Sequence, residues 1–279
     1  MEKITLNNSL ECPVVGIGTF MLAPPDAESS VREALRMGYR LIDTANAYVN
    51  ERAVGRGIRA SGVKREEIFL STKLWPSEYE NPNAVDETLE RLGVEYVDLL
   101  YIHQPAGSWL AGYRLLEAAY RSGKARSIGI SNFEGAYIAE LETKWEIVPQ
   151  FIQVEAHPYF TQTELRKTLA KYDIKLMSWY PLGHGDKSLI NEEIFASLGK
   201  KYSKTPAQVI LRWHIQMGFV VIPGSKNVAH IRDNLDILDF ALTEDEMAQI
   251  AALDKGVRYY HRTDEQLRQF AAWRPSFER

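Results

Sequence analysis

Four side chains that can hold or move a proton lie where short apolar segments of this sequence end. Asp43 and Tyr48 belong to the segment LIDTANAY, Lys73 to FLSTKLW, and His103 to VDLLYIHQP. Segments of this kind normally exclude Lys and Asp unless the two are paired, because an unpaired buried charge is costly or shifts its pKa until it is neutral. A carboxylate, a phenol, an ammonium group and an imidazole at one end of a sheet therefore predict a proton-handling site.

The four residue types suit the delivery of a proton to an oxygen atom. A tyrosine hydroxyl has a reference pKa of about 10, so it donates its proton slowly near neutrality unless a cation stabilises the phenolate. Lys73 is the candidate cation and Asp43 its counter-charge, which makes Tyr48 the expected proton donor. His103 is expected to orient a carbonyl oxygen by a hydrogen bond. The chemistry that fits is protonation of an oxygen that gains negative charge, as when hydride reaches the carbon of a ketone or aldehyde.

The composition points to a partner that is a small molecule. The chain has 279 residues, 45% of them hydrophobic, with a formal net charge of −4 and a pI of about 5.9, and it has no basic run suited to nucleic acid. The lone Cys12 cannot form an internal disulfide, and no apolar stretch suits a signal peptide or a membrane span. We expect a cytoplasmic monomer with no nucleic-acid or membrane partner, and the scattered histidines predict no metal site.

Eight short β-rich segments alternate with stretches long enough for a helix. The expected strands cover residues 14–19, 41–45, 69–74, 97–103, 127–131, 151–157, 175–180 and 219–225. Their nearly continuous apolar character is typical of parallel strands covered on the outside by helices. Eight units in about 250 residues predict an α/β fold, a (β/α)8 TIM barrel that forms a single domain over residues 1–279. The pair Gly16 and Gly18 lacks the third glycine of a dinucleotide-binding loop and is weak evidence for an open sheet.

Helix ends are marked by caps. Capping boxes are expected at Thr161–Glu164 and Thr243–Glu246, and Thr205 before Pro206 predicts another helix start. Left-handed C-terminal caps are expected at Gly38, Gly93, Gly123 and Gly218.

The sequence resembles the aldo-keto reductase superfamily over essentially its full length, and most closely the bacterial members that are similar to 2,5-diketo-gluconate reductases. The resemblance lies in the segments GIGTF, GYRLIDTANAYVNE, STKLW, DLLYIHQP, GKARSIGISNF, QVEAHPY, SWYPLGHG, TPAQVILRW and VVIPGSK, which follow the family's order and spacing. It implies an NAD(P)H-dependent oxidoreductase that reduces an aldehyde or ketone to the alcohol. It also implies a catalytic tetrad of Asp43, Tyr48, Lys73 and His103, with Tyr48 as the general acid.

The same resemblance implies where the cofactor and the substrate bind. Ser131, Asn132 and Gln153 match residues that hydrogen-bond the nicotinamide carboxamide, and Trp179 matches the aromatic residue that stacks on the nicotinamide ring. The cofactor-binding loop, much of which matches the family's pyrophosphate loop, comprises Tyr180, Pro181, Leu182, Gly183 and His184. The adenosine end comprises Gly224, Ser225, Lys226, His230, Asp233 and Asn234. The substrate pocket comprises Phe20, Trp75, His103 and Gln104.

Two departures from the family pattern bear on specificity. The family usually has Lys at the position of Gly224 and Arg at that of His230, and both hold the 2′-phosphate of NADPH. A hydrogen bond to a charged group contributes roughly 1.5 to 3 kcal/mol, so the loss of two weakens the preference for NADPH. We expect NADPH as the cofactor with NADH as an alternative, and Lys226 or Arg232 as replacement contacts. Gln104 stands where the family commonly has Trp, which predicts a roomier, more polar pocket for small aldehydes, dicarbonyls or keto sugars.

The sequence leaves other interpretations open. A nucleotide-binding regulatory or redox-sensing subunit would keep the cofactor residues with little turnover, and a barrel can also host lyase or isomerase chemistry. Taken singly, Asp43 fits a loop cap, Tyr48 a half-exposed ring and His103 a core histidine. The short segment PAGSWLAGY and the short C-terminal tail predict an open, permissive pocket. The aromatic residues of the tail RYYHRTDEQLRQFAAWRPSFER fit either a position beneath the barrel or one over the pocket.

Overall fold

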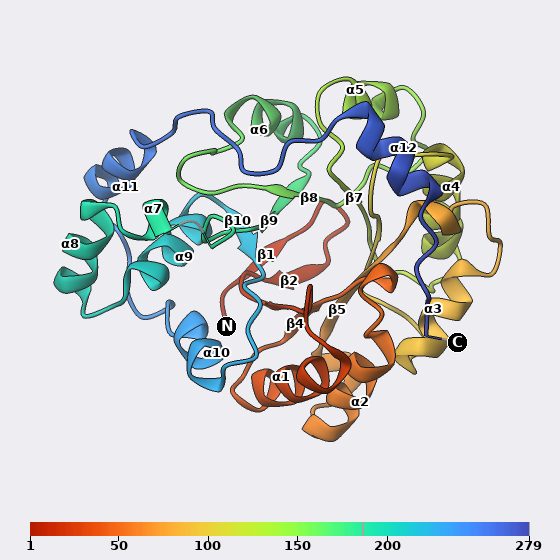
Figure 1. Ribbon diagram of the computed structural model, residues 1–279, viewed down its shortest axis with the longest axis horizontal. Helices are drawn as coiled ribbons and strands as arrows, with labels where there is room; N and C mark the ends of the chain where they lie inside the picture. The colour runs from red at the N-terminus through yellow and green to blue at the C-terminus, as the bar shows by residue number, and fades with distance from the viewer. Residues whose placement is uncertain (186, 279) are drawn as a thin grey trace.

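The central sheet is built from short parallel strands that follow one another in chain order (Figure 1). The computed structural model describes residues 1–185 and 187–278. The strands are β3 (Ile17–Gly18), β4 (Leu41–Asp43), β5 (Phe69–Leu74), β6 (Leu99–Ile102), β7 (Ile128–Ser131), β8 (Phe151–Glu155), β9 (Lys175–Trp179) and β10 (Phe219–Val221). Each pairs in parallel with the next, from β3 to β10. The predicted (β/α)8 fold is confirmed, with several strands shorter than expected.

The last strand meets the chain just before the first and closes the barrel. Val15 forms a parallel bridge with Val221, and the N–H of Gly16 donates to the carbonyl of Val221 at 2.8 Å. A Cβ on Gly18 would lie 2.7 Å from the carbonyl oxygen of Ile222, closer than side chains are normally found. Gly16 and Gly18 therefore serve barrel closure, which explains why the pair lacks the third glycine of a phosphate-binding loop.

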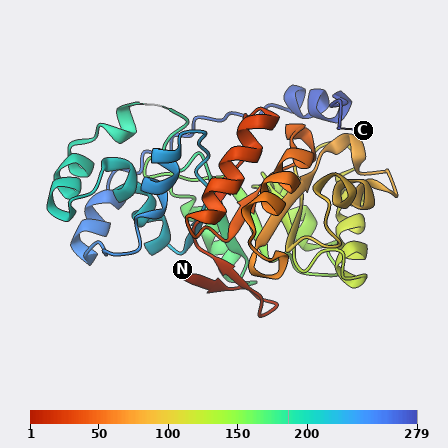
Figure 2. The ribbon, with the colours of Figure 1, turned by 90° about the horizontal axis from the view of Figure 1, so that it is seen from below.

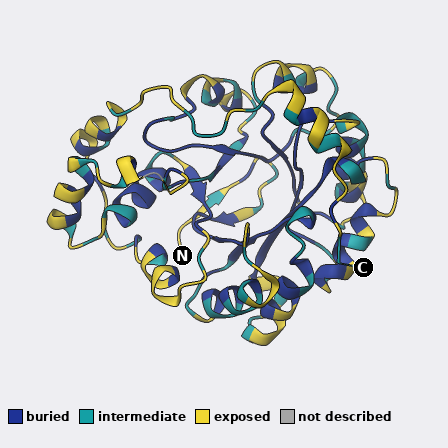
Figure 3. Ribbon diagram, in the orientation of Figure 1, coloured by how far each residue is buried: buried dark blue, intermediate teal, exposed yellow. Residues whose placement is uncertain are grey.

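Helices surround the sheet and bury the faces turned toward it (Figure 3). Those that follow the first five barrel strands are α1 (Pro24–Arg36), α2 (Glu51–Ser61), α3 (Ala84–Leu92), α4 (Trp109–Arg121) and α5 (Ala136–Glu142). The later ones are α6 (Thr163–Ala170), α7 (Lys187–Ile190), α8 (Glu193–Tyr202), α9 (Pro206–Gln216), α10 (Val228–Leu235), α11 (Glu244–Ala251) and α12 (Asp264–Ala272). The apolar positions at helical spacing, such as Val31 and Leu35 in α1, are buried as the sequence predicts.

The predicted caps are right in most cases and wrong in one. Thr205 and Thr243 accept hydrogen bonds in capping boxes of α9 and α11, and the four predicted glycines have positive φ. The box expected at Thr161–Glu164 does not form. Gln162, with a left-handed φ of 57°, caps α6 instead, and the hydroxyl of Thr161 donates to Asp254. The helix thus starts one residue later than the predicted box requires.

The two ends of the barrel are closed differently (Figure 2). A hairpin of β1 (Lys3–Thr5) and β2 (Glu11–Pro13), which the sequence analysis did not predict, lies at the end where the strands begin. α12 lies at the opposite end. Leu6 and Cys12 of the hairpin pack on the barrel interior, whose buried side chains include Leu41, Phe69, Leu99, Tyr101, Phe151, Met177 and Val220. This apolar plug leaves the other end of the barrel for polar side chains.

Two features are absent from the described residues. No helix within residues 1–185 and 187–278 is long and apolar enough to cross a membrane. The same part of the chain contains no group of three or more His, Cys, Asp or Glu side chains arranged to hold a metal ion.

Candidate active site

The four proton-handling side chains come together at the carboxyl end of three adjacent strands. Asp43 is the last residue of β4, and Tyr48 ends the short 3-10 helix η1 (Asn46–Tyr48) that follows it. Lys73 lies near the end of β5, and His103 directly follows β6. Parallel neighbouring strands end at the same side of a barrel, so the local sequence alone brings these groups to one place.

A buried ion pair forms the floor of the site. The Nζ of Lys73 donates to Asp43 Oδ2 at 2.5 Å and to the carbonyl of Thr44 at 2.8 Å. The other oxygen of Asp43 accepts from Ser71 at 2.6 Å and from Gln153 at 3.0 Å. The side chains of Lys73 and Asp43 are 0% and 2% exposed, so each charge depends on the other for compensation.

Tyr48 and His103 lie above this pair in protonation states that suit a donor. The Nζ of Lys73 is 5.1 Å from the centroid of the half-buried Tyr48 ring, and the rings of Tyr48 and His103 are 5.7 Å apart. Desolvation, with Asp43 as a further cause, raises the pKa of Tyr48 well above its ordinary value, so the phenol keeps its proton. Burial and then the charge of Lys73 lower the pKa of His103, so its imidazole is neutral. Burial thus raises the pKa of Tyr48 by more than the charge of Lys73, as predicted from the sequence, would lower it.

These groups open into a cavity of about 530 Å³ at the carboxyl end of the barrel. Its polar wall includes Asp43, Tyr48, His103, Gln104, Ser131, Asn132 and Gln153. Its aromatic wall includes Phe20, Trp75, Trp179, Tyr180, Tyr260, Phe270 and Trp273. Phe20 and Trp273 are each about half exposed, at 50% and 48%, so apolar surface also rims the entrance. All three residues expected in the substrate pocket besides His103 line this cavity.

Aromatic residues of the C-terminal tail form part of the cavity wall, so the tail takes the second of the two positions that the sequence left open. The indole N–H of Trp75 donates to the carbonyl of Phe270 in α12 at 3.1 Å. The ring of Trp75 meets those of Phe270 and Trp273 edge-on, at centroid distances of 5.3 and 5.0 Å. The helix itself was not predicted, although Thr263 and Gln266 form the S/T-x-x-E/Q pattern that starts α12.

A chain of hydrogen bonds fixes the orientation of two amides in the polar wall. The indole N–H of Trp179 can only donate, so its 3.2 Å bond turns the amide oxygen of Asn132 toward Trp179. The amide nitrogen of Asn132 then donates to the side-chain oxygen of Gln104 at 3.2 Å. Gln104 consequently keeps its own amide nitrogen for the cavity, where no described residue accepts a hydrogen bond from it.

The comparison with known proteins agrees with this arrangement. Residues 14–255 match the sequence profile described as the Aldo/keto reductase family. This chain belongs to the aldo/keto reductase family. It is an oxidoreductase of a family that reduces carbonyl compounds with NAD(P)H.

Alignments with individual relatives extend over nearly the whole of this chain. The chain is 43% identical over 262 residues to a 9,11-endoperoxide prostaglandin H2 reductase of Trypanosoma cruzi (strain CL Brener), a match that covers 91% of this chain and 92% of the relative. It is 42% identical over 271 residues to a glyoxal reductase of Bacillus subtilis (strain 168), covering 95% and 98%. A crystal structure of an aldo/keto reductase from Brucella melitensis superposes with a TM-score of 0.86 at 40% identity, covering 91% of this chain and 99% of that one.

The residues matched to the cofactor divide into two groups in this aldo-keto reductase. Ser131, Asn132, Gln153, Trp179, Tyr180, Pro181, Leu182, His184 and Gly224 line the cavity. Gly183 lies within the same loop, where left-handed φ angles at Tyr180, Gly183 and His184 make a tight turn and the rings of Tyr180 and His184 stack at 3.9 Å. Ser225, Lys226, His230, Asp233 and Asn234 lie beyond the cavity, on the loop after β10 and on α10.

The packing of Gly224 explains why the reductase has no side chain there. A Cβ at this position would lie 2.8 Å from the carbonyl oxygen of Gly18. The family's usual lysine would therefore require the loop after β10 to move away from β3. Lys226 is 72% exposed and lies 3.8 Å from Asp26, so its charge is partly compensated by a carboxylate.

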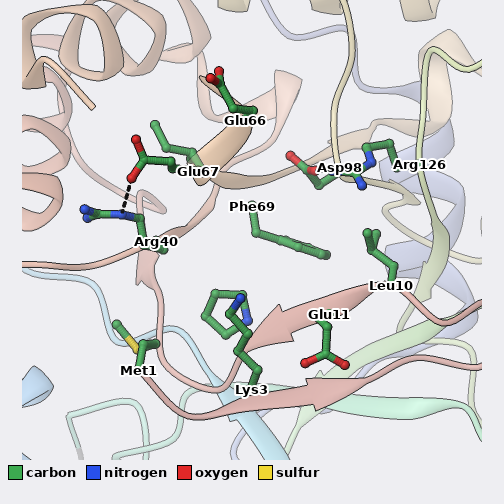
Figure 4. A pocket seen from close by; sticks show the side chains of 12 residues that line it. Met1, Lys3, Leu10, Glu11, Arg40, Glu66, Glu67, Phe69, Asp98 and Arg126 are labelled. Carbon is green, nitrogen blue, oxygen red and sulfur yellow. Dashed lines mark hydrogen bonds and ion pairs between the residues drawn. The ribbon is translucent and has the colours of Figure 1, made fainter. Parts of the chain in front are cut away.

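A second cavity lies at the other end of the barrel, beside the hairpin (Figure 4). Its volume is about 300 Å³, and Phe69 lies in its middle. Two ion pairs border it: Arg40 with Glu67 at 3.9 Å and Arg126 with Asp98 at 3.0 Å. Lysine, arginine, aspartate and glutamate side chains all line this cavity, so its charges do not favour a ligand of one sign.

Proposed function

We propose that this reductase converts small polar carbonyl compounds (aldehydes, dicarbonyls and keto sugars) into alcohols, with Tyr48 as the proton donor. The observation that carries the proposal is the buried Asp43–Lys73 pair beneath a protonated tyrosine and a neutral histidine that face one cavity. No other described cavity combines a proton donor with an orienting imidazole.

The polar and aromatic walls fit a nicotinamide cofactor. Ser131, Asn132 and Gln153 line the cavity with hydroxyl and amide groups, and Trp179 lines it with a flat ring. The polar groups can hydrogen-bond the carboxamide of the nicotinamide, and the indole can stack on its ring. When bound, NAD(P)H supplies the hydride. We assign these four residues to the nicotinamide end and the loop from Tyr180 to His184 to the pyrophosphate.

The protein's own groups act on the substrate oxygen. His103, kept neutral by burial, orients the carbonyl by a hydrogen bond. Tyr48 donates its proton as negative charge develops on that oxygen, and the ammonium of Lys73 stabilises the resulting phenolate. Asp43 holds the ammonium in place and keeps it charged in an apolar setting.

The substrate class follows from Gln104. Its amide nitrogen borders the cavity beside His103 and is free to donate a hydrogen bond. A substrate with a second oxygen next to the reacting carbonyl would accept that bond, whereas a purely apolar ketone would leave the amide unpaired at a cost of about 1 to 3 kcal/mol. We therefore propose α-dicarbonyls and hydroxylated carbonyls as favoured substrates.

We propose NADPH as the preferred cofactor, with substantial use of NADH. His230 and Gly224 replace the two charged contacts that the family usually makes with the 2′-phosphate, and Lys226 is the nearest replacement on the loop. Because Lys226 is exposed and near Asp26, its contribution to phosphate binding is small.

The decisive experiment follows nucleotide absorbance with methylglyoxal as substrate, with NADPH and NADH titrated side by side. Fast oxidation of either nucleotide supports the proposal. The variant Y48F should abolish turnover while the dissociation constant of the nucleotide changes little, since only the proton donor is removed. Tight nucleotide binding without turnover of any carbonyl would favour a regulatory subunit instead, and a Y48F enzyme with normal rate would remove Tyr48 from the mechanism.

A further inference from the structure

The segment between α11 and α12 passes the carboxyl ends of β8 and β7 (Figure 1). Residues 258–262 of this segment, here called the strap, are tied down by Glu155, the last residue of β8. The carboxylate of Glu155 accepts from the backbone N–H of Tyr259 at 2.6 Å and of Tyr260 at 3.0 Å. Glu155 is fully buried, and His157 contacts the same carboxylate at 3.0 Å.

A second anchor holds the start of the strap. Arg258 donates to both oxygens of Glu134, at 2.9 and 3.2 Å, and lies 3.6 Å from Glu155. Both arginine partners are carboxylates, and charge-assisted hydrogen bonds of this kind are the stronger ones. The strap therefore has a fixed position relative to the ends of β7 and β8.

From this fixed position the strap reaches the nicotinamide wall at two points. The ring of Tyr260 meets that of Trp179 edge-on at a centroid distance of 5.5 Å. Nη1 of Arg262 donates to the backbone carbonyl of Asn132 at 2.6 Å. The strap thus contacts both the aromatic ring and the amide residue that we assign to the nicotinamide end.

Asn132 has a backbone that benefits from an external contact. Its φ is +63°, in the left-handed region that residues other than glycine adopt at a cost, although asparagine tolerates it better than most. Its side chain accepts from Trp179 and donates to Gln104, so a rotation of this backbone would disturb both partners. The bond from Arg262 is the contact that holds the carbonyl of this residue from outside the barrel.

We propose that Arg262 is a positioning residue for the nicotinamide end of the site: by holding the backbone of Asn132 it keeps the Trp179–Asn132–Gln104 chain in the geometry that binds the nicotinamide. The inference rests on the proposed function, because it requires these residues to contact the cofactor. It differs from a simple lid, since Arg262 acts on a backbone carbonyl behind the amide and does not need to touch the ligand.

The test compares two ligands that differ only in the nicotinamide. Calorimetric titration would give dissociation constants for NADPH and for 2′-phospho-ADP-ribose, which keeps the adenosine and pyrophosphate but lacks the nicotinamide. Arg262→Met removes the guanidinium and keeps an unbranched stem. Loss of a hydrogen bond from a charged donor should weaken NADPH binding about 10-fold, and should change 2′-phospho-ADP-ribose binding less than about 2-fold.

Two further variants provide the controls. Arg268→Met removes an arginine from α12 that is 69% exposed and pairs with Glu265 in the same helix, so both dissociation constants should match the wild type. Arg262→Lys keeps a cationic donor and should recover part of the NADPH affinity; it also replaces Arg262→Met as the test if that variant does not fold.

Each outcome decides the matter. A selective loss of NADPH affinity supports the positioning role. Equal losses for both ligands, or none for either, overturn it while leaving the reductase proposal intact. A wild-type protein that binds neither these two ligands nor NADH would overturn the reductase proposal and this inference together.

Discussion

Replacement of Lys73 by methionine isolates the electrostatic part of the mechanism. K73M keeps the length of the side chain and removes a charge whose Nζ lies 5.1 Å from the centroid of the Tyr48 ring. With an effective dielectric constant of about 20, a unit charge at this distance stabilises a phenolate by about 3 kcal/mol, which corresponds to about 2 pKa units. Tyr48 already has a raised pKa, so losing this support should lower kcat about 100-fold.

The same substitution should also destabilise the fold, because Asp43 would remain buried without its cation. Removing one partner of a buried pair costs about 3 to 5 kcal/mol in the free energy of unfolding. The double variant K73M/D43N removes both charges and should recover most of that stability without recovering the rate.

The assay combines kcat, from nucleotide oxidation at saturating methylglyoxal, with denaturant unfolding. A folded K73M enzyme whose kcat stays within about 3-fold of wild type would refute the assigned role of the ammonium. A double variant that regains full activity would refute it equally, since it too lacks the cation.

Four further predictions concern pH, cofactor choice, packing at position 224 and substrate choice. Burial lowers the pKa of His214 to about 4, below the value of about 6.5 in the unfolded chain. The contribution of His214 to the free energy of unfolding is therefore complete above pH 6.5, and about 3 kcal/mol of it is lost as the pH falls from about 6.5 to 4. Denaturant unfolding at pH 7 and 4.5 should show a smaller loss in H214Q than in wild type; equal losses would contradict the assignment. H230R should raise the ratio of kcat/KM for NADPH to that for NADH about 10-fold, and an unchanged ratio would count against a phosphate contact at this position. G224K should lower the melting temperature, because its Cβ would press on the carbonyl of Gly18; an unchanged melting temperature would count against that clash. Q104L should lower kcat/KM for methylglyoxal about 5-fold relative to butyraldehyde, and a uniform change would argue against a hydrogen bond from the amide.

Much of the site follows from local sequence. Asp43, Lys73 and His103 are within one residue of the end of an apolar strand, and parallel strands in chain order must bring those ends together. No long-range information is needed for that step. The resemblance to a known family added the proposal that Ser131, Asn132, Gln153 and Trp179 bind the nicotinamide, which periodicity alone does not suggest.

The contacts that sequence reasoning missed are all long-range. The hydroxyl of Thr161 donates to Asp254, 93 positions further along the chain. Trp75 and Phe270 are 195 positions apart, and no local pattern around either residue predicts that the two are in contact. The group that blocks a lysine at position 224 cannot be identified from the sequence either, because it is the backbone carbonyl of Gly18, which is 206 positions away along the chain.

The site has a floor built from barrel strands and a wall built partly from the C-terminal tail. The floor, Asp43 and Lys73, belongs to strands held on both sides by their neighbours, so it can loosen only when the barrel itself opens. Phe270 in α12 and Trp273 directly after it belong to a segment at the edge of the molecule, where both rings pack against Trp75 (Figure 2). Evolution or an engineer can therefore alter the residues after Arg262 to admit a different carbonyl compound, while the groups that transfer the proton stay as they are.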